Sequence, residues 1–206
     1  MEINSRRNST RIILAIAAVF IAILVFQFLE DPNEEYSQEV TEFRKNRDDE
    51  LSKDGLTLPD SLRAWFRGLS YFDPDISYRV MARFIQNPGN EMMIVETTKG
   101  KFEEYAKVGF IEFEMKEKSY RLIAFREGKN SSREIFVPFH DGTNDKETYH
   151  FRYLRARLTK TIAYIDFNYS YNPTCVYNEE YSCPKPPEEN ILDLAIHAGE
   201  KMFSWK

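Results

Sequence analysis

From Tyr78 to Asn168, apolar and polar residues alternate along short segments that turn residues separate. Because successive side chains of a strand point to opposite faces of its sheet, a period of two predicts β-strands with one buried face. The predicted strands are 78–85, 91–98, 105–115, 120–126, 133–139, 148–156 and 161–168, with 191–197 as an eighth strand or a helix. With no long helical pattern between them, seven or eight such segments predict a mainly β domain: an antiparallel barrel or sandwich. The 16 Phe and 12 Tyr fit this class.

The N-terminus contains a strongly apolar run, residues 12–29, in which Gln27 is the one polar residue. About 18 residues form a helix of roughly 27 Å, close to the minimum that spans a bilayer. Three arginines precede the run and acidic residues follow it, so the positive-inside rule places residues 1–11 in the cytoplasm and the rest outside, in the periplasm. A cleaved signal peptide is the alternative, but the run ends in bulky and acidic residues, which favours an uncleaved signal anchor.

The N-terminal 29 residues and the rest of the chain also differ in net charge. The whole chain of 206 residues carries −5, whereas the first 29 residues carry Arg6, Arg7 and Arg11 against Glu2. The remainder is therefore strongly acidic, which argues against a nucleic-acid partner. A chain of this length has room for one membrane segment and one ordinary domain.

Two helices are predicted between the membrane segment and the strands. Residues 30–55 are rich in Glu, Lys, Arg and Asp and predict a charged helical linker that leads away from the membrane. Residues 58–66 predict a short amphipathic helix, capped by Asp60 or Ser61, that packs on the domain through one apolar face. That face consists of Leu62, Trp65, Phe66 and Leu69. The extramembrane domain is then residues 56–206.

The segment 166–187 is unlike an ordinary core strand, because it contains both cysteines of the chain, Cys175 and Cys183, among tyrosines, asparagines and prolines. Outside the cytoplasm, the two cysteines could close a nine-residue loop as a disulfide, worth about 2–3 kcal/mol in the chain-entropy model. Two alternatives remain open. One is a thiolate pair that binds a metal with His197 or Glu200, although the spacing is not that of a zinc knuckle. The other is a pair of free or redox-active thiols.

Polar residues in and around this segment are the candidate site. Asp166 and Asn168 fall on the same face of a strand, and Arg152 could supply a charge partner. One interpretation is a structural polar network, since buried polar groups need partners. The other is a ligand-binding or catalytic floor with Asp166 as acid or base. The full set of ligand-binding candidates is Arg152, Asp166, Asn168, Tyr171, Asn172 and Glu200.

Several motifs together resemble a known family. They are Phe136-Val-Pro-Phe139-x-Asp141-x-Thr143, Asp166-Phe-Asn168, Tyr171-Asn-Pro173-x-Cys175, Cys183-Pro and Ala198-Gly-Glu200-Lys201. They resemble the bacterial and archaeal domain-of-unknown-function family sixteen-eighty-four, over roughly residues 56–201. That family has no established activity, so the resemblance leaves both the reaction and any cofactor unknown.

Three functions therefore remain open for the sequence. The first is binding of a small ligand or a protein partner around residues 166–183, which predicts an aromatic-lined pocket. The second is an enzyme of unknown reaction that uses Asp166, Asn168 and Arg152. The third is a structural or assembly module, in which the polar network is fully satisfied. The sequence lacks a glycine-rich phosphate loop, His-Glu-x-x-His and Gly-x-Ser-x-Gly, which excludes the enzymes that need them.

Overall fold

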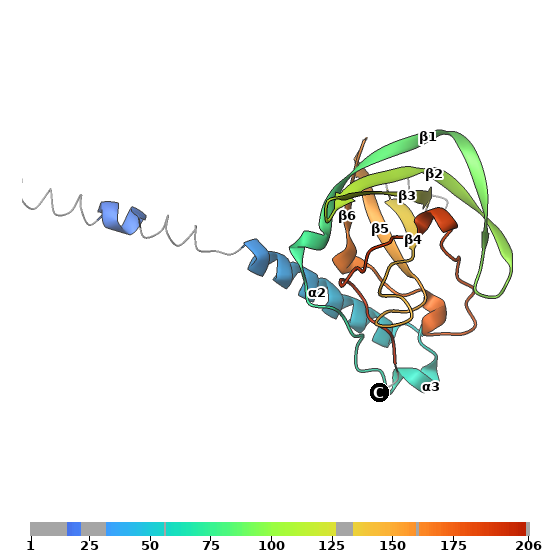
Figure 1. The fold of residues 1–206 in the computed structure, drawn as a ribbon. Coiled ribbons are helices and arrows are strands. Elements are labelled where there is room, and N and C mark those ends of the chain that lie inside the picture. The colour runs from blue at the N-terminus through green and yellow to red at the C-terminus, as the bar shows by residue number, and fades with distance from the viewer. Residues whose placement is uncertain (1–15, 22–31, 56, 127–133, 160, 205–206) are drawn as a thin grey trace, which may run out of the picture.

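The computed structural model describes residues 16–21, 32–55, 57–126, 134–159 and 161–204. Its centre is a closed barrel of antiparallel strands in the order β1-β2-β3-β4-β5-β6, with β1 paired to β6 (Figure 1). The strands are β1 Arg79–Glu96, β2 Phe102–Met115, β3 Lys118–Arg126, β4 Glu134–Phe139, β5 Arg152–Thr159 and β6 Ile162–Asp166. Two helices precede them, α2 Pro32–Lys53 and α3 Asp60–Arg63. The predicted mainly β, antiparallel fold is confirmed as a barrel.

The number of strands is lower than predicted, partly because β1 combines the predicted strands 78–85 and 91–98. The register of β1 against β2 shifts between Gln86 and Glu91, so the interruption in the sequence is a bulge and not a turn. Gly109 lies opposite Gln86, and a Cβ there would collide with the Ile85 carbonyl oxygen. Glycine thus permits the close backbone approach that the bulge requires.

The predicted eighth strand, 191–197, is absent from the described part of the chain, where Ile191 makes a single bridge to His140. The side chain of Asn190 instead makes the hydrogen bonds to neighbouring strands that a strand backbone would make. Its amide nitrogen donates to the carbonyl oxygens of Ile123 (3.0 Å) and Pro138 (2.7 Å), and its oxygen accepts from the Ile123 amide (2.6 Å). One buried carboxamide thus connects β3 and β4 beyond the short stretch where they pair.

The barrel interior is filled by apolar side chains from alternate positions of the strands. Leu154 of β5, Ile165 of β6 and Phe139 of β4 are fully buried there. Phe167, which follows β6, and Ile196, from the C-terminal segment, join the same cluster. The C-terminal segment therefore contributes to the core although it forms no strand.

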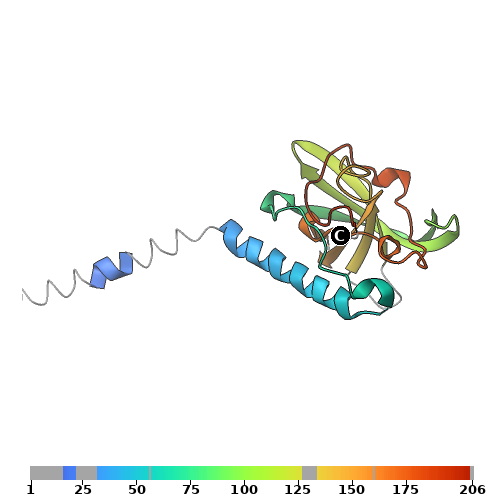
Figure 2. The same ribbon diagram turned by 90° about the horizontal axis from the view of Figure 1, so that it is seen from below.

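Helix α2 lies along the outside of the barrel, as Figures 1 and 2 both show. Tyr36, Val40 and Leu51 are buried against the domain, and so is Arg44. A helix is therefore present where the charged linker was predicted, but it packs on the barrel. Tyr36, Val40, Arg44 and Leu51 follow one another at spacings of four, four and seven, which places them on one helix face. The strongly charged composition of the segment hides this pattern.

A small apolar cluster joins the C-terminal end of α2 to the segment that carries the cysteines. Leu51, Leu58 and Tyr177 form its buried centre, and Phe66 and Leu69 pack against it. Phe66 and Leu69 pack as predicted, but Trp65 is 69% exposed, so its assignment to the packed face was wrong. Helix α3 begins at Asp60, after Pro59 as its N-cap, and spans barely one turn. Trp65 lies beyond that turn, and helical spacing does not fix its direction.

The predicted membrane segment 12–29 lies outside the described residues, apart from residues 16–21, which are helical. Among the helices that the structure does describe, none combines the length and the apolar character needed to cross a bilayer.

Candidate functional site

Arg152, at the start of β5, is fully buried and holds the C-terminal segment against the end of the barrel. Its guanidinium forms an ion pair with Asp141 (2.6 Å), and both side chains are completely enclosed. It also donates to the carbonyl oxygens of Ile196 (2.9 Å) and Ala198 and to the hydroxyl of Ser170 (3.3 Å). The predicted pairing of Arg152 with Asp166 was therefore wrong, because Asp141 takes that place.

Asp166 and Asn168 do lie side by side, as their strand spacing predicted. The Asn168 side-chain amide donates to the Asp166 carboxylate (3.0 Å), and so does the Asn168 backbone amide (3.0 Å). Two hydrogen bonds join Asn168 to the backbone of Asp75. The carboxylate also accepts from the Tyr36 hydroxyl at 2.8 and 2.9 Å, so it faces α2 and not the barrel interior. Burial raises the pKa of Asp166, and these hydrogen bonds act in the opposite direction.

Glu200 is also buried, although an acid after a glycine turn would ordinarily be exposed. Its carboxylate pairs with Arg47 of α2 (2.6 Å) and accepts from the backbone amide of Asn172 (2.8 Å) and from the Tyr177 hydroxyl. The Asn172 side chain donates to the Lys201 carbonyl oxygen (2.9 Å). Glu200 thus connects α2, the C-terminal segment and the segment that carries the cysteines.

Tyr171 lies between two cations, with the guanidinium carbons of Arg47 and Arg155 5.0 and 5.2 Å from its ring centroid. Its backbone exchanges two hydrogen bonds with Tyr153 of β5 (2.9 and 3.0 Å). The six predicted ligand-binding residues therefore belong to internal contacts of the domain. The charges and hydrogen bonds of four of them hold chain segments together: those of Arg152, Asp166, Asn168 and Glu200.

The cysteine loop, residues 174–183, is fastened to the β1–β2 turn. The Thr98 amide donates to the Cys183 carbonyl oxygen (2.8 Å), and the Cys183 amide donates to the Thr98 hydroxyl (3.0 Å). Both cysteines are free thiols in the structure, and the Cys175 amide donates to the Cys183 sulfur at 3.1 Å. The disulfide stays a prediction, and the structure places the two residues in contact.

Neither partner suggested for a thiolate metal pair stands free for that role. His197 contacts Glu147 (3.1 Å), and Glu200 pairs with Arg47. Within the described ranges, no group of three or more His, Cys, Asp or Glu side chains is arranged to hold a metal ion.

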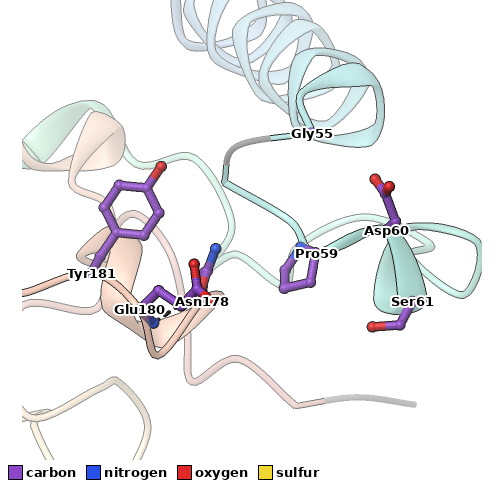
Figure 3. Close-up of a pocket in the computed structure, with 7 residues that line it drawn as sticks. All are labelled: Gly55, Pro59, Asp60, Ser61, Asn178, Glu180 and Tyr181. Atoms are coloured by element: carbon purple, nitrogen blue, oxygen red, sulfur yellow. Dashed lines mark hydrogen bonds between the residues drawn. The ribbon is translucent and has the colours of Figure 1, made fainter.

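An open pocket of about 620 Å³ lies beside the cysteine loop. Figure 3 shows its two walls: Asn178, Glu180 and Tyr181 from the loop face the chain that connects α2 to α3. The opposite wall is Gly55, Pro59, Asp60 and Ser61. Leu58 and Tyr177, which precede Pro59 and Asn178 in the chain, belong to one buried apolar cluster with Leu51 and so connect the two walls. Sequence reasoning pointed to the loop but missed Gly55 and residues 59–61, since nothing in their spacing shows that they meet it.

A second open pocket, of about 700 Å³, lies between α2 and residues 66–74. Its central groups are already engaged in holding the helix. Asp48 accepts from the Leu69 amide (3.2 Å) and the Tyr71 hydroxyl (3.2 Å), and Arg44 donates to the Phe72 carbonyl oxygen (2.8 Å). The pocket beside the cysteine loop is therefore the better candidate for a ligand.

The proteins that this chain resembles have a known fold or family but no known function. No curated protein matches the chain. A solved structure does: the solution NMR structure of an uncharacterised protein from gene locus rrnAC0354 of Haloarcula marismortui. The two chains are 35% identical, the match covers 82% of this chain and 95% of that one, and the TM-score is 0.64. The model of a protein family of unknown function, DUF1684, matches residues 64–201, and the chain therefore belongs to that family.

Proposed function

We propose that this protein is a membrane-anchored, extracytoplasmic β-barrel domain that binds a small polar ligand in the pocket beside the cysteine loop. One contrast supports the proposal most strongly. Asn178, Glu180 and Tyr181 line an open pocket, whereas Arg152 and Glu200 are buried in ion pairs and the half-buried Asp166 is held by Tyr36 and Asn168. Groups held in this way by internal partners are poor candidates for acid or base catalysis, because those partners occupy the place of a reacting atom.

The chemistry of the pocket favours a ligand that carries positive charge and hydrogen-bond donors, such as an amine. Glu180 contributes a carboxylate and Tyr181 an exposed aromatic ring from the loop wall. Asp60, whose carboxylate pairs with Arg63, adds a second acid on the opposite wall. A cation gains from carboxylates and from the face of an aromatic ring. The acidic character of the domain also raises the local concentration of cations.

The proposed location rests on residues 12–29, whose apolar run and flanking charges favour a single membrane span with the domain outside. Protease added to spheroplasts, from which the outer layers of the cell have been removed, tests it through a tag placed after Lys206. We expect loss of the tag while the cytoplasmic membrane stays intact, and protection of the tag in intact spheroplasts would contradict the proposal.

Binding is tested with the full chain in detergent micelles, with spermidine as the probe amine and calorimetric titration as the measurement. Glu180→Gln should weaken spermidine binding up to about fivefold, because a solvent-exposed ion pair contributes about 1 kcal/mol or less. The matched control is Glu188→Gln, which removes an exposed acid that is not part of the pocket. Equal weakening by both variants would mean that spermidine responds to net charge and not to this pocket.

A further inference from the structure

The two cysteines form an asymmetric pair. Cys183 is 4% exposed and lies in the apolar cluster beneath the loop, packed with aromatic residues such as Phe151 and Tyr153. Cys175 is half-buried and belongs to the edge of the same cluster. An external reagent therefore meets Cys175 first, while Cys183 lies behind it.

The backbone around Cys183 is fixed more firmly than that around Cys175. Besides the two bonds between Cys183 and Thr98, the Ser182 hydroxyl donates to the Thr97 hydroxyl (2.8 Å). Cys175 lies instead in a single 3-10 turn, Thr174–Val176. A reaction that joins the two sulfurs thus requires movement mainly of the exposed cysteine.

The environment also divides the two thiols chemically. Hydrogen bonds from the Cys183 thiol and the Thr98 hydroxyl lower the pKa of Cys175 to about 7, against the effect of burial. For Cys183, donation of its proton to Cys175 raises the pKa, and burial raises it further. Since the thiolate is the nucleophile, a large part of Cys175 is reactive at neutral pH, while Cys183 keeps its proton.

We propose that Cys175 and Cys183 form a dithiol–disulfide exchange site, with Cys175 as the attacking thiol and Cys183 as the resolving thiol. The substrate class is an external disulfide. The Cys175 thiolate attacks one sulfur of that disulfide, the external S–S bond breaks, and one external thiolate leaves and takes up a proton. Cys183 then loses its proton and attacks the Cys175 sulfur, which releases the second external thiol. Both protein thiols are oxidised, and one external disulfide is reduced to two thiols.

This inference stands apart from ligand binding, because it needs the contact between the cysteines and not the pocket. The test uses the full chain in detergent micelles, reduced with dithiothreitol, freed of reductant and then exposed to oxidised glutathione. Intact-mass spectrometry follows each species. The wild type should lose two hydrogen atoms without retaining glutathione. Cys183→Ser should retain one glutathione on Cys175, and Cys175→Ser should react at least about tenfold more slowly, since a protonated, buried thiol is a poor nucleophile.

The rate at Cys175 in Cys183→Ser should also rise through neutral pH, because the serine hydroxyl can still donate to the thiolate. Circular dichroism on each variant establishes that it is folded. Equal rates of glutathione capture by the two single variants would overturn the assignment of roles. A wild-type chain that retains glutathione, or one that dithiothreitol cannot reduce in its folded state, would overturn the exchange site itself.

Discussion

The Arg152 cluster and the cysteine loop are both polar, but the polar groups of the first are buried and those of the second line an open pocket. Around Arg152, the partners are an enclosed carboxylate and carbonyl oxygens of the C-terminal segment. In the cysteine loop, Asn178, Glu180 and Tyr181 face an open pocket, and Cys175 is accessible from outside. The first arrangement gains stability from burial and closure, and the second exposes side chains to an open pocket.

Within residues 166–183, the difference separates side chains that hold the fold together from side chains that could contact a ligand. Asp166, Asn168 and Asn172 look as chemically promising as Asn178 and Glu180 when read along the chain. Their environments differ, because Asn168 and Asn172 are buried and Asp166 is held by Tyr36 and Asn168, whereas Asn178 and Glu180 line an open pocket. The predictions below test whether the two regions behave as differently as their contacts indicate.

The largest effect is expected for Arg152→Ala. Removing one partner of an enclosed ion pair leaves Asp141 buried without its charge partner, which should lower the free energy of unfolding by about 3–5 kcal/mol. Urea unfolding followed by circular dichroism measures the loss. Arg157→Ala is the matched control, since Arg157 is an exposed arginine on the same strand, and it should cost less than about 0.5 kcal/mol. Similar losses of unfolding free energy in both variants would show that the buried ion pair of Arg152 does not stabilise the fold more than an exposed arginine does.

The next effect is expected for Gly199→Ala, which acts on the same end of the barrel. Gly199 has a φ of +79°, and an added Cβ would collide with the Ser170 hydroxyl and lie 2.6 Å from the Ser170 carbonyl oxygen. The combined backbone strain and overpacking should cost about 3 kcal/mol. Gly100→Ala is a close control: its φ is +69°, but its Cβ would meet nothing within 4 Å. It should lose only the strain component, about 1 kcal/mol.

A smaller effect concerns pH and the contact between α2 and the barrel. Burial raises the pKa of Asp166, so the folded state holds the proton more tightly than the unfolded state. The stabilisation from that proton is present at low pH and is lost as the pH rises from the unfolded pKa through the folded one. Asp166→Asn removes this titration, so the wild type should lose stability relative to the variant as the pH rises from about 3 to 7.

Asp193 supplies a comparison of opposite sign. Lys118 lowers the pKa of this exposed aspartate, first through a hydrogen bond and then through its charge. Its stabilisation is therefore present above the unfolded pKa and is lost as the pH falls. Stability curves of Asp193→Asn and Asp166→Asn against pH should diverge from the wild type in opposite directions. Parallel curves would show that Asp166 is not buried against α2.

The smallest effect on stability is expected in the pocket. Tyr181 is partly exposed, so Tyr181→Ala should change the free energy of unfolding by no more than about 0.5–1 kcal/mol. The same variant should weaken spermidine binding several-fold, because the aromatic ring is part of the loop wall of the pocket. A variant that loses stability but binds spermidine as before would place Tyr181 with the structural residues.

The sequence predicted the parts of the fold that depend on local patterns. Alternation located all six strands of the described barrel, and the charged composition located α2. The errors arose where tertiary contacts decide. β1 continues through a bulge near Gln86 where a turn was expected, and the side chain of Asn190 hydrogen-bonds to the barrel where an eighth strand was expected. The partner of Arg152 could not be identified either, because Asp141 reaches it through the folding of a loop.

The candidate site was predicted only in part for the same reason. The cysteine loop stands out by composition, and the loop wall of the pocket lies within it. The other wall comes from Gly55 and residues 59–61, more than a hundred positions away along the chain. Their meeting depends on the packing of Leu58 on Tyr177, two residues that look unremarkable in the sequence.

The most direct test of the division between architecture and function is an NMR titration of the isotope-labelled full chain in micelles with spermidine. The account predicts that amide shifts move at Asn178, Glu180 and Tyr181 and at residues 57–61, while Arg152, Asp166 and Asn168 stay unchanged. Shifts centred on Arg152, Asp166 and Asn168, or no shifts at all, would contradict it.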